Sequence, residues 1–150
     1  LFYIGNHELA RDVVRTSLSV DQHADIGRAF CSSIRNGNVL VTEVSGDYSS
    51  ELLSVLADFL LRLREIAFVI VVEVKGEEYL LSARSRDREI DAGFIIRRML
   101  ADIGTGGGHA HMAGGVIRPG KYPGAGALLE RAVDEIRAYR STDETESQAD

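Results

Sequence analysis

The sequence predicts a mixed α/β domain, in which a sheet of about four or five strands is covered by helices and preceded by a helical linker. Apolar residues recur at helical spacing in several segments. One β-branched run, "IAFVIVVEV" (residues 66–74), is instead almost continuously apolar, as in a buried strand. The chain has 150 residues and is 45% hydrophobic, so it can bury roughly two-thirds of its unfolded surface around one core.

The N-terminal segment is predicted to be helical throughout. "HELARDVVRTSL" (residues 7–18) and "DQHADIGRAFCSSI" (residues 21–34) both place apolar side chains on one stripe, and Asp21 is a possible N-cap of the second helix. The chain opens with "LFYIGN", which resembles a cut through a longer protein. Residues 1–38 are therefore expected to be a helical segment that precedes the main domain.

The centre of the chain predicts strands around one strongly amphipathic helix. "VLVTEV" (residues 39–44) is expected to be a strand, and "SSELLSVLADFLLRLRE" (residues 49–65) a helix capped by Ser49 or Ser50. The β-branched run at 66–74 shows no polar alternation until Glu73, which is typical of a central strand covered on both faces. "KGEE" then turns the chain into "YLLSARS", so that a hairpin is expected.

Toward the C-terminus the pattern returns to helices. We expect one helix over residues 87–104, ended by Gly104, and another over residues 125–140. "GVIRP" between them is short, and its proline predicts an edge strand. Residues 39–141 are thus predicted to form one domain. The acidic segment 142–150 has no apolar content and is predicted to be disordered.

Composition limits the possible functions. The net charge of −6 argues against indiscriminate coating of nucleic acid, although it allows a local basic patch. The single cysteine, Cys31, cannot form an intramolecular disulfide, and no apolar run is long enough to cross a bilayer. We expect a cytoplasmic protein without membrane association.

The stretch "GTGGGHAHMAGG" (residues 104–115) holds six of the fifteen glycines and two histidines in twelve residues. Such a cluster indicates close approach to the backbone, although a flexible loop has the same composition. If "HAHMA" starts a short helix, then Gly106, Gly107 and Gly108 would present free N–H groups to an anion such as phosphate. A ring N–H of His109 could donate to the same ligand.

A second cluster, "SARSR", ends a predicted strand. Alternation places Ser82, Arg84 and Arg86 on one face, and the planar guanidinium of Arg84 suits a phosphate. The competing interpretation is a solvated strand end whose arginines pair with nearby acidic residues, which we favour for Arg86. Residues 80–121 hold seven basic and four acidic side chains, against ten and nineteen in the rest of the chain. The positive charge is therefore concentrated around the glycines.

Two other motifs are weaker. "GVIRPGKY" has the spacing of a Walker A motif, but Tyr122 replaces the Ser or Thr that would hold magnesium. His109 and His111 could begin a metal site, yet no further Cys or His lies nearby. Neither motif predicts a site in its own right.

The combination of "SARSR", an amphipathic helix and "GTGGGHAHMAGG" closely resembles the C-terminal DHH-associated domain of DHH-family phosphoesterases. These include RecJ-like nucleases, nano-RNases and cyclic-dinucleotide phosphodiesterases. The shared pattern is met by Ser82, Arg84 and Ser85, followed by Gly106, Gly107, Gly108 and His109, then Ala113 and Gly114. Met112 departs from it, since a small residue is usual there. A glycine-rich relative also ends alanyl-tRNA synthetases, without this arrangement of arginine, helix and glycines.

The resemblance implies that Ser82, Arg84, Ser85, Gly106, Gly107, Gly108 and His109 bind the phosphate of an oligonucleotide or nucleotide. It also implies that residues 1–38 are a linker toward an N-terminal catalytic domain outside this sequence. That domain, with its Asp-His-His motif, would hold manganese or another divalent metal, so no catalytic residue, metal or cofactor is expected in this chain. The parent protein would hydrolyse short oligonucleotides or small nucleotides between the two domains, with homodimer formation possible. The alternative is a regulatory or oligomerisation module whose glycine loop is structural.

Overall fold

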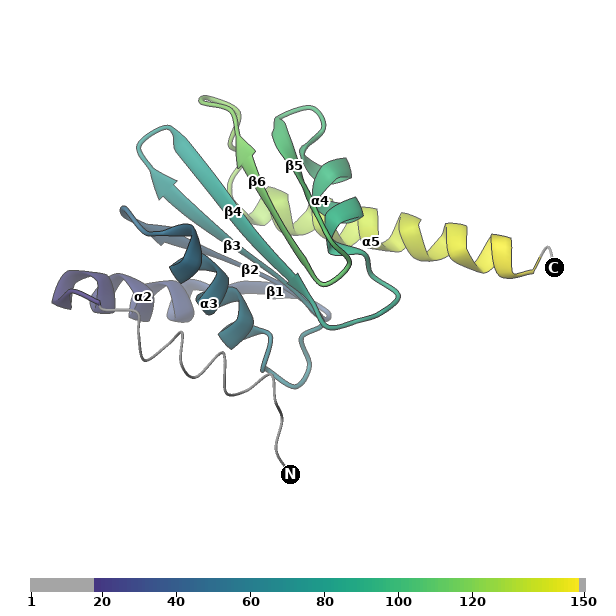
Figure 1. Cartoon of the computed structure of the whole chain (residues 1–150), viewed down its shortest axis with the longest axis horizontal. Helices are drawn as coiled ribbons and strands as arrows, with labels where there is room; N and C mark the ends of the chain where they lie inside the picture. The colour runs from purple at the N-terminus through teal and green to yellow at the C-terminus, as the bar shows by residue number, and fades with distance from the viewer. Residues whose placement is uncertain (1–17, 149–150) are drawn as a thin grey trace.

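The computed structural model describes residues 18–148 and shows a six-stranded mixed sheet with helices on both faces (Figure 1). The strand order is β1-β2-β3-β4-β6-β5; β2 and β3 are parallel, and every other neighbouring pair is antiparallel. The strands are β1 (Ile34–Asn36), β2 (Val39–Ser45), β3 (Phe68–Lys75), β4 (Glu78–Ser85), β5 (Gly104–Gly108) and β6 (Met112–Ile117). The mixed α/β class is confirmed, with more strands than expected.

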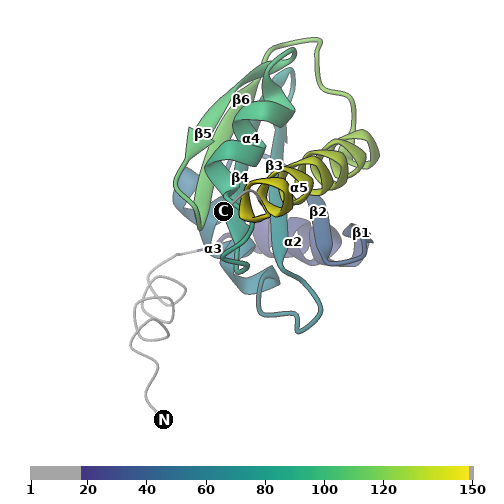
Figure 2. The same ribbon diagram turned by 90° about the vertical axis from the view of Figure 1, so that its right-hand side faces the viewer.

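Four described helices cover the sheet unequally (Figures 1 and 2). They are α2 (Val20–Ser32), α3 (Ser50–Leu60), α4 (Ala92–Leu100) and α5 (Ala125–Ser147). The helices α2 and α3 pack on one face, over β2, β3 and β4, whereas α4 and α5 pack on the other. Among the described helices none covers the α3-side face of β6 and β5.

The central strands are buried because both of their faces meet a helix. All of Phe68–Val72 in β3 is fully buried, as the absence of polar alternation in this run predicts. Alternate residues feed two cores: Phe68, Ile70 and Val72 face α4 and α5, while Val69 and Val71 face α2 and α3. Ser49 caps α3 through a hydrogen bond from the Leu52 amide, as predicted.

The N-terminal segment differs from the expected linker. From Val20 onward it belongs to the domain, because Ile26 and Ala29 of α2 are buried against the sheet and Ile34–Asn36 pairs with β2. The N-cap of α2 is Ser19, in a capping box with Gln22, rather than Asp21. The helix expected over residues 7–18 lies almost wholly outside the described residues.

The acidic segment expected to be disordered is helical as far as it is described. The last helix, α5, continues to Ser147, beyond the predicted start of the tail at residue 142. Ser141, Thr142 and Thr145 donate their hydroxyls to carbonyls four residues earlier, at 2.9–3.1 Å. The segment also lacks glycine and proline, so nothing in it stops the helix.

The glycine-rich segment is a β-hairpin rather than a turn that opens a helix. α4 ends at Leu100, and Gly104 starts β5 instead of capping that helix. "GVIRP" contributes to β6, which lies inside the sheet between β4 and β5; Pro119 follows the last residue of β6, so it does not interrupt the pairing. At this end of the sheet the edge strand is β5, and β1 forms the other edge.

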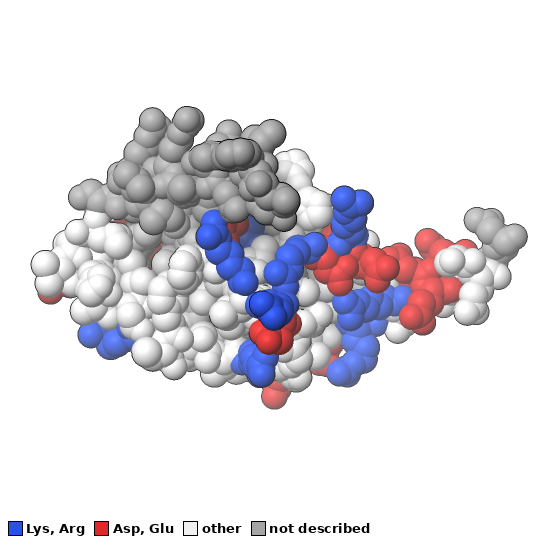
Figure 3. All heavy atoms as spheres, turned by 90° about the horizontal axis from the view of Figure 1, so that it is seen from below, with Lys and Arg blue, Asp and Glu red and all other residues white. Residues whose placement is uncertain are grey.

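Charge is distributed unevenly on the surface. Figure 3 shows blue Lys and Arg side chains near the middle of the face seen from below, while red acidic side chains dominate the projecting C-terminal end. The last turns of α5 carry Asp143, Glu144 and Glu146. No helix in the described part of the chain is long and apolar enough to cross a membrane.

Candidate functional site: a glycine-floored groove

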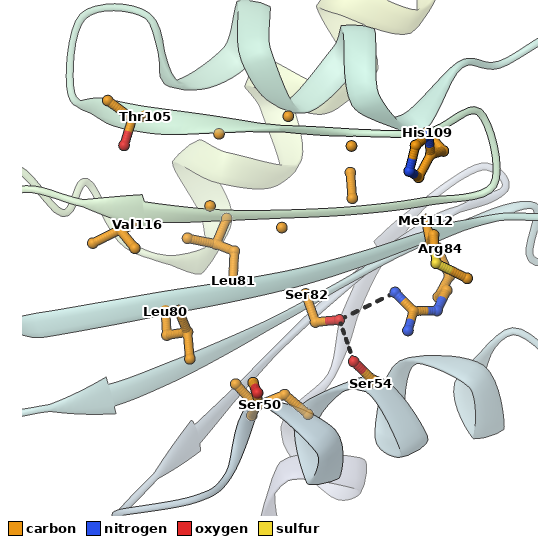
Figure 4. A pocket seen from close by; sticks show the side chains of 17 residues that line it. Ser50, Ser54, Leu80, Leu81, Ser82, Arg84, Thr105, His109, Met112 and Val116 are labelled. Carbon is orange, nitrogen blue, oxygen red and sulfur yellow. Dashed lines mark hydrogen bonds between the residues drawn. The ribbon is translucent and has the colours of Figure 1, made fainter.

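A groove of about 560 Å³ lies where α3 stops covering the sheet (Figure 4). One wall is the side of α3, from Ser50 to Ser54, and the floor is formed by β4, β6 and β5. Its lining contains most of the residues singled out from the sequence, namely Ser82, Arg84, Gly106, Gly107, Gly108 and His109. The structure therefore brings two segments about twenty residues apart into one site.

Strand register explains how these segments meet. Ser82 of β4 is paired with Gly114 of β6, which is paired in turn with Gly107 of β5. Directly paired residues share a face of the sheet. Two glycines therefore extend the floor outward from Ser82, and neither contributes a side chain that would fill it.

The two ends of the groove differ chemically. Figure 4 shows Arg84, Met112 and His109 at one end, and Leu80, Val116 and Thr105 at the other. The floor is mainly apolar, with Met112 and Val116 each about half exposed. A ligand with an anionic group and a less polar body fits this division.

Successive glycines of β5 and β6 face opposite sides of the sheet and so have different neighbours. A Cβ on Gly106 would lie 2.6 Å from Cγ2 of Ile96 in α4, and one on Gly115 would lie 2.5 Å from Cδ1 of Leu100. A Cβ on Gly107 would meet only Arg97, at 3.5 Å or more. Gly106 and Gly115 thus let α4 pack closely, whereas Gly107 leaves the groove open.

Arg84 is held in place by its neighbours. Its Nε donates to Oδ1 of Asp58 in α3 at 2.8 Å, and its Nη1 donates to the Ala83 carbonyl at 2.9 Å and to Oγ of Ser82 at 3.4 Å. The side chain is 12% exposed. Within residues 18–148, Nη2 has no hydrogen-bond partner. The guanidinium is therefore oriented before any ligand arrives, which reduces the entropy lost on binding.

His109 occupies the tight turn between β5 and β6, and its backbone is fixed on both sides. Its N–H donates to the Met112 carbonyl at 2.7 Å, and its carbonyl accepts from the Gly93 amide of α4 at 3.0 Å. The side chain is exposed at the mouth of the groove. No helix follows the glycines, so the prediction of an anion site at a helix N-terminus is wrong. Of His109, the imidazole is the group that remains available to a ligand.

Ser85 lies outside the groove. It follows Arg84 in an extended strand, so its side chain faces the opposite side of the sheet. There it is buried, and its hydroxyl donates to the Asp87 carbonyl at 3.0 Å. Arg86, for which we favour pairing with nearby acidic residues, instead donates to backbone carbonyls of the segment after α3, including those of Leu61 and Arg64.

Sequence reasoning missed the contribution of α3. Ser50 and Ser54 line the groove, Oγ of Ser54 lies 3.5 Å from Oγ of Ser82, and Asp58 anchors Arg84. These three residues are spaced four apart, so they form one polar line along the helix beside its leucine face. That spacing was present in the sequence and predicts a polar line on this helix, but it does not predict that the line faces β4 and Arg84.

A second hollow, beside α2, has a more acidic lining. It contains Asp25 and Glu43, and the guanidinium of Arg28 is paired with Asp25. Tyr48 also donates its hydroxyl to Asp25 at 2.9 Å; burial, followed by this hydrogen bond, raises the pKa of Tyr48 to about 12. A phosphate-bearing ligand therefore suits the first groove better than the second.

Metal-binding groups are not clustered in the part of the chain that the structure describes. No set of three or more His, Cys, Asp or Glu side chains there could hold an ion. His111, considered with His109 as the start of a metal site, instead has Nδ1 at 3.3 Å from the Ser85 carbonyl oxygen.

Comparison with known proteins defines the class. The DHHA1 domain family matches residues 36–138, which include the whole groove. The chain therefore belongs to the DHHA1, or DHH-associated, domain family.

The relatives differ in how much of their own length this chain covers. The chain is 30% identical over 117 residues to the A-adding tRNA nucleotidyltransferase of Geobacter sulfurreducens, covering 75% of this chain and 13% of that protein. It resembles the C-Ala domain of alanyl-tRNA synthetase from Aquifex aeolicus with 26% identity and a TM-score of 0.53, covering 67% of this chain and 96% of that one.

An exopolyphosphatase-related protein from Bacteroides fragilis shares the fold, with a TM-score of 0.59 and 16% identity over 86% of this chain and 38% of that chain. The chain thus spans a minor part of the longer proteins that it resembles. The C-terminal domain of alanyl-tRNA synthetase, which the sequence analysis distinguished from this chain, therefore resembles it in both sequence and fold.

Proposed function

We propose that the groove binds the phosphate of a nucleotide or oligonucleotide, with Arg84 and His109 as its contacts. The observation that carries this proposal is the state of Arg84, which is nearly buried, anchored by Asp58 and still has one amino group without a partner in the described residues. An arginine oriented in this way is suited to a phosphate oxygen.

The floor of the groove suits the rest of such a ligand. Gly107 and Gly114 leave backbone surface exposed, and Met112 and Val116 provide apolar contact. None of the 17 lining residues is Phe, Tyr or Trp, so a base on the floor would lie against backbone and aliphatic atoms, and the imidazole of His109 at the mouth is the one ring among them. This arrangement favours recognition of the phosphate and sugar chain over recognition of base identity.

The names of the relatives suggest which nucleotide to test first. Two relatives with at least 25% identity, the A-adding nucleotidyltransferase and the alanyl-tRNA synthetase domain, carry tRNA in their names. We therefore propose an RNA strand as the ligand. The similarity to DHH-family phosphoesterases supports a parent protein in which a separate domain, with manganese or another divalent metal, supplies the hydrolytic chemistry while this domain orients the strand.

The test is a calorimetric titration of the chain with a 5′-phosphorylated oligoribonucleotide and with its unphosphorylated form. Loss of a charge-assisted hydrogen bond costs roughly 1.5–3 kcal/mol, so we expect Arg84→Ala to weaken binding by about one to two orders of magnitude. His109→Ala should have a smaller effect in the same direction. Arg84→Lys should restore part of the affinity, because an ammonium cannot reproduce the fork that also contacts Asp58.

Ser85→Ala is the matched control, since this serine lies on the opposite face of the same strand. Its affinity should equal that of the unchanged chain, with any loss confined to the thermal midpoint. Unchanged affinity in a folded Arg84→Ala variant, or the same loss in Ser85→Ala, would show that the groove is structural.

A further inference from the structure

Arg97 provides a second positive charge beside the groove, in addition to Arg84. Arg97 lies in α4, on the opposite face of the sheet, yet its Nη2 would be 3.5 Å, and its Nε 3.8 Å, from a Cβ placed on Gly107. Gly107 is a floor residue of the groove, and β5 is the edge strand. Arg97 therefore reaches the rim of the groove around the open edge of β5.

No other group in the described residues accounts for this placement. Arg97 is exposed, and it has no hydrogen-bond or ion-pair partner within residues 18–148. Its neighbour Arg98 is also exposed but donates to Glu135 of α5 at 3.4 Å. Two successive arginines of one helix thus differ: one belongs to a helix–helix contact and the other is available at the groove.

The two guanidinium groups are too far apart for one phosphate. Gly107 is separated from Ser82 by two strand spacings, which amount to about 10 Å. Arg84 extends the separation, because its side chain points away from β6 toward Asp58 in α3. Charge-assisted contacts to phosphate are about 2.7–2.9 Å long, so a single phosphate does not bridge this gap.

We infer that Arg97 binds a second phosphate of the same strand, so that the ligand crosses the glycine floor from the α3 wall to the edge of β5. This inference rests on the proposed function of the groove. It also specifies the ligand class further: the groove takes a chain with at least two separated phosphates in preference to inorganic phosphate or a mononucleotide.

The experiment compares Arg97→Ala with Arg98→Ala against 5′-phosphorylated oligoribonucleotides of one to four nucleotides. Both variants remove one positive charge from adjacent positions, so a general change in the field of the protein affects both equally. We expect Arg97→Ala to leave mononucleotide affinity unchanged and to lower the affinity for three or four nucleotides about fivefold to tenfold. Arg98→Ala should change neither.

Salt dependence provides an independent measurement on the same samples. Each phosphate contact to a single strand contributes about 0.7 to the slope of log affinity against log salt, and Arg97→Ala should reduce the slope by about that amount. Equal effects of the two variants, or an Arg97→Ala effect that is the same at every length, would overturn the inference while Arg84→Ala still supports the groove. Absence of binding by the unchanged chain would overturn both proposals.

Discussion

The two halves of the sheet are built differently. Strands β2 and β3 are covered by helices on both faces, and every residue of Phe68–Val72 is buried in one of the two cores. Within residues 18–148, strands β6 and β5 are covered by helices on one face only, and five of the six glycines between residues 104 and 115 line the resulting groove. Where the second helical layer is absent, a sheet face becomes the floor of a groove instead of part of the core, and glycine keeps that floor clear of side chains.

The largest effect is expected in the covered half. Leu56 of α3 is buried against β3 and β4, so Leu56→Ala should leave a cavity and lower the free energy of unfolding by about 2–5 kcal/mol. Urea denaturation measures the change. A loss within experimental error would mean that α3 is not packed on the sheet as described.

An intermediate effect is expected where β5 meets α4. Gly106→Ala would bring a Cβ to 2.9 Å from the Gly114 carbonyl oxygen as well as against Ile96, and this overpacking should cost about 1–3 kcal/mol of unfolding free energy. Gly126→Ala is the control, because a Cβ there meets nothing within 4 Å. If both variants have the same stability, the close approach of α4 to β5 is wrong.

The smallest effect on stability is expected one residue further along. Gly107 has no positive φ and its Cβ would have ordinary contacts, so Gly107→Ala should leave the unfolding free energy unchanged or raise it by about 0.4–1 kcal/mol. A positive φ, which would make a side chain costly, is not found at Gly107; it is found at the neighbouring Gly108, with φ 153°.

The affinity of Gly107→Ala for an oligoribonucleotide should nevertheless fall about fivefold or more, equivalent to about 1 kcal/mol, because the new methyl group lies on the groove floor. The same titration applied to Gly106→Ala separates the two roles: its loss of binding should disappear under conditions that keep it folded. Unchanged affinity in Gly107→Ala would remove Gly107 from the binding surface.

The covered half could be predicted from the sequence because the pattern of its apolar side chains indicates which faces are buried. The run at residues 66–74 has no polar alternation, and the leucines of α3 recur at helical spacing, so both elements were assigned correctly. The glycine half could not be assigned in this way. Gly104–Gly108 has almost no side chains, hence no period of two, and only pairing with β6 makes it a strand.

Several residues that line the groove could be singled out from the sequence, but their geometry could not be predicted. Arg84 and His109 do line one groove, yet Ser85 faces the other side, and the helix expected after the glycines is the turn of a hairpin. Alternation along β4 would have separated Ser85 from Arg84. Asp58 is different: its pairing with Arg84 depends on how α3 lies across β4, which no local pattern reports.

The alternation of glycines along β5 has a consequence for how this domain can change over evolutionary time. Gly106 and Gly115 are constrained by the packing of α4, whatever the domain binds, while Gly107 is constrained only by what crosses the groove. A descendant that abandoned its ligand would keep the first two positions and accumulate side chains at the third. The residue at position 107 would then act as a record of whether the groove is still in use.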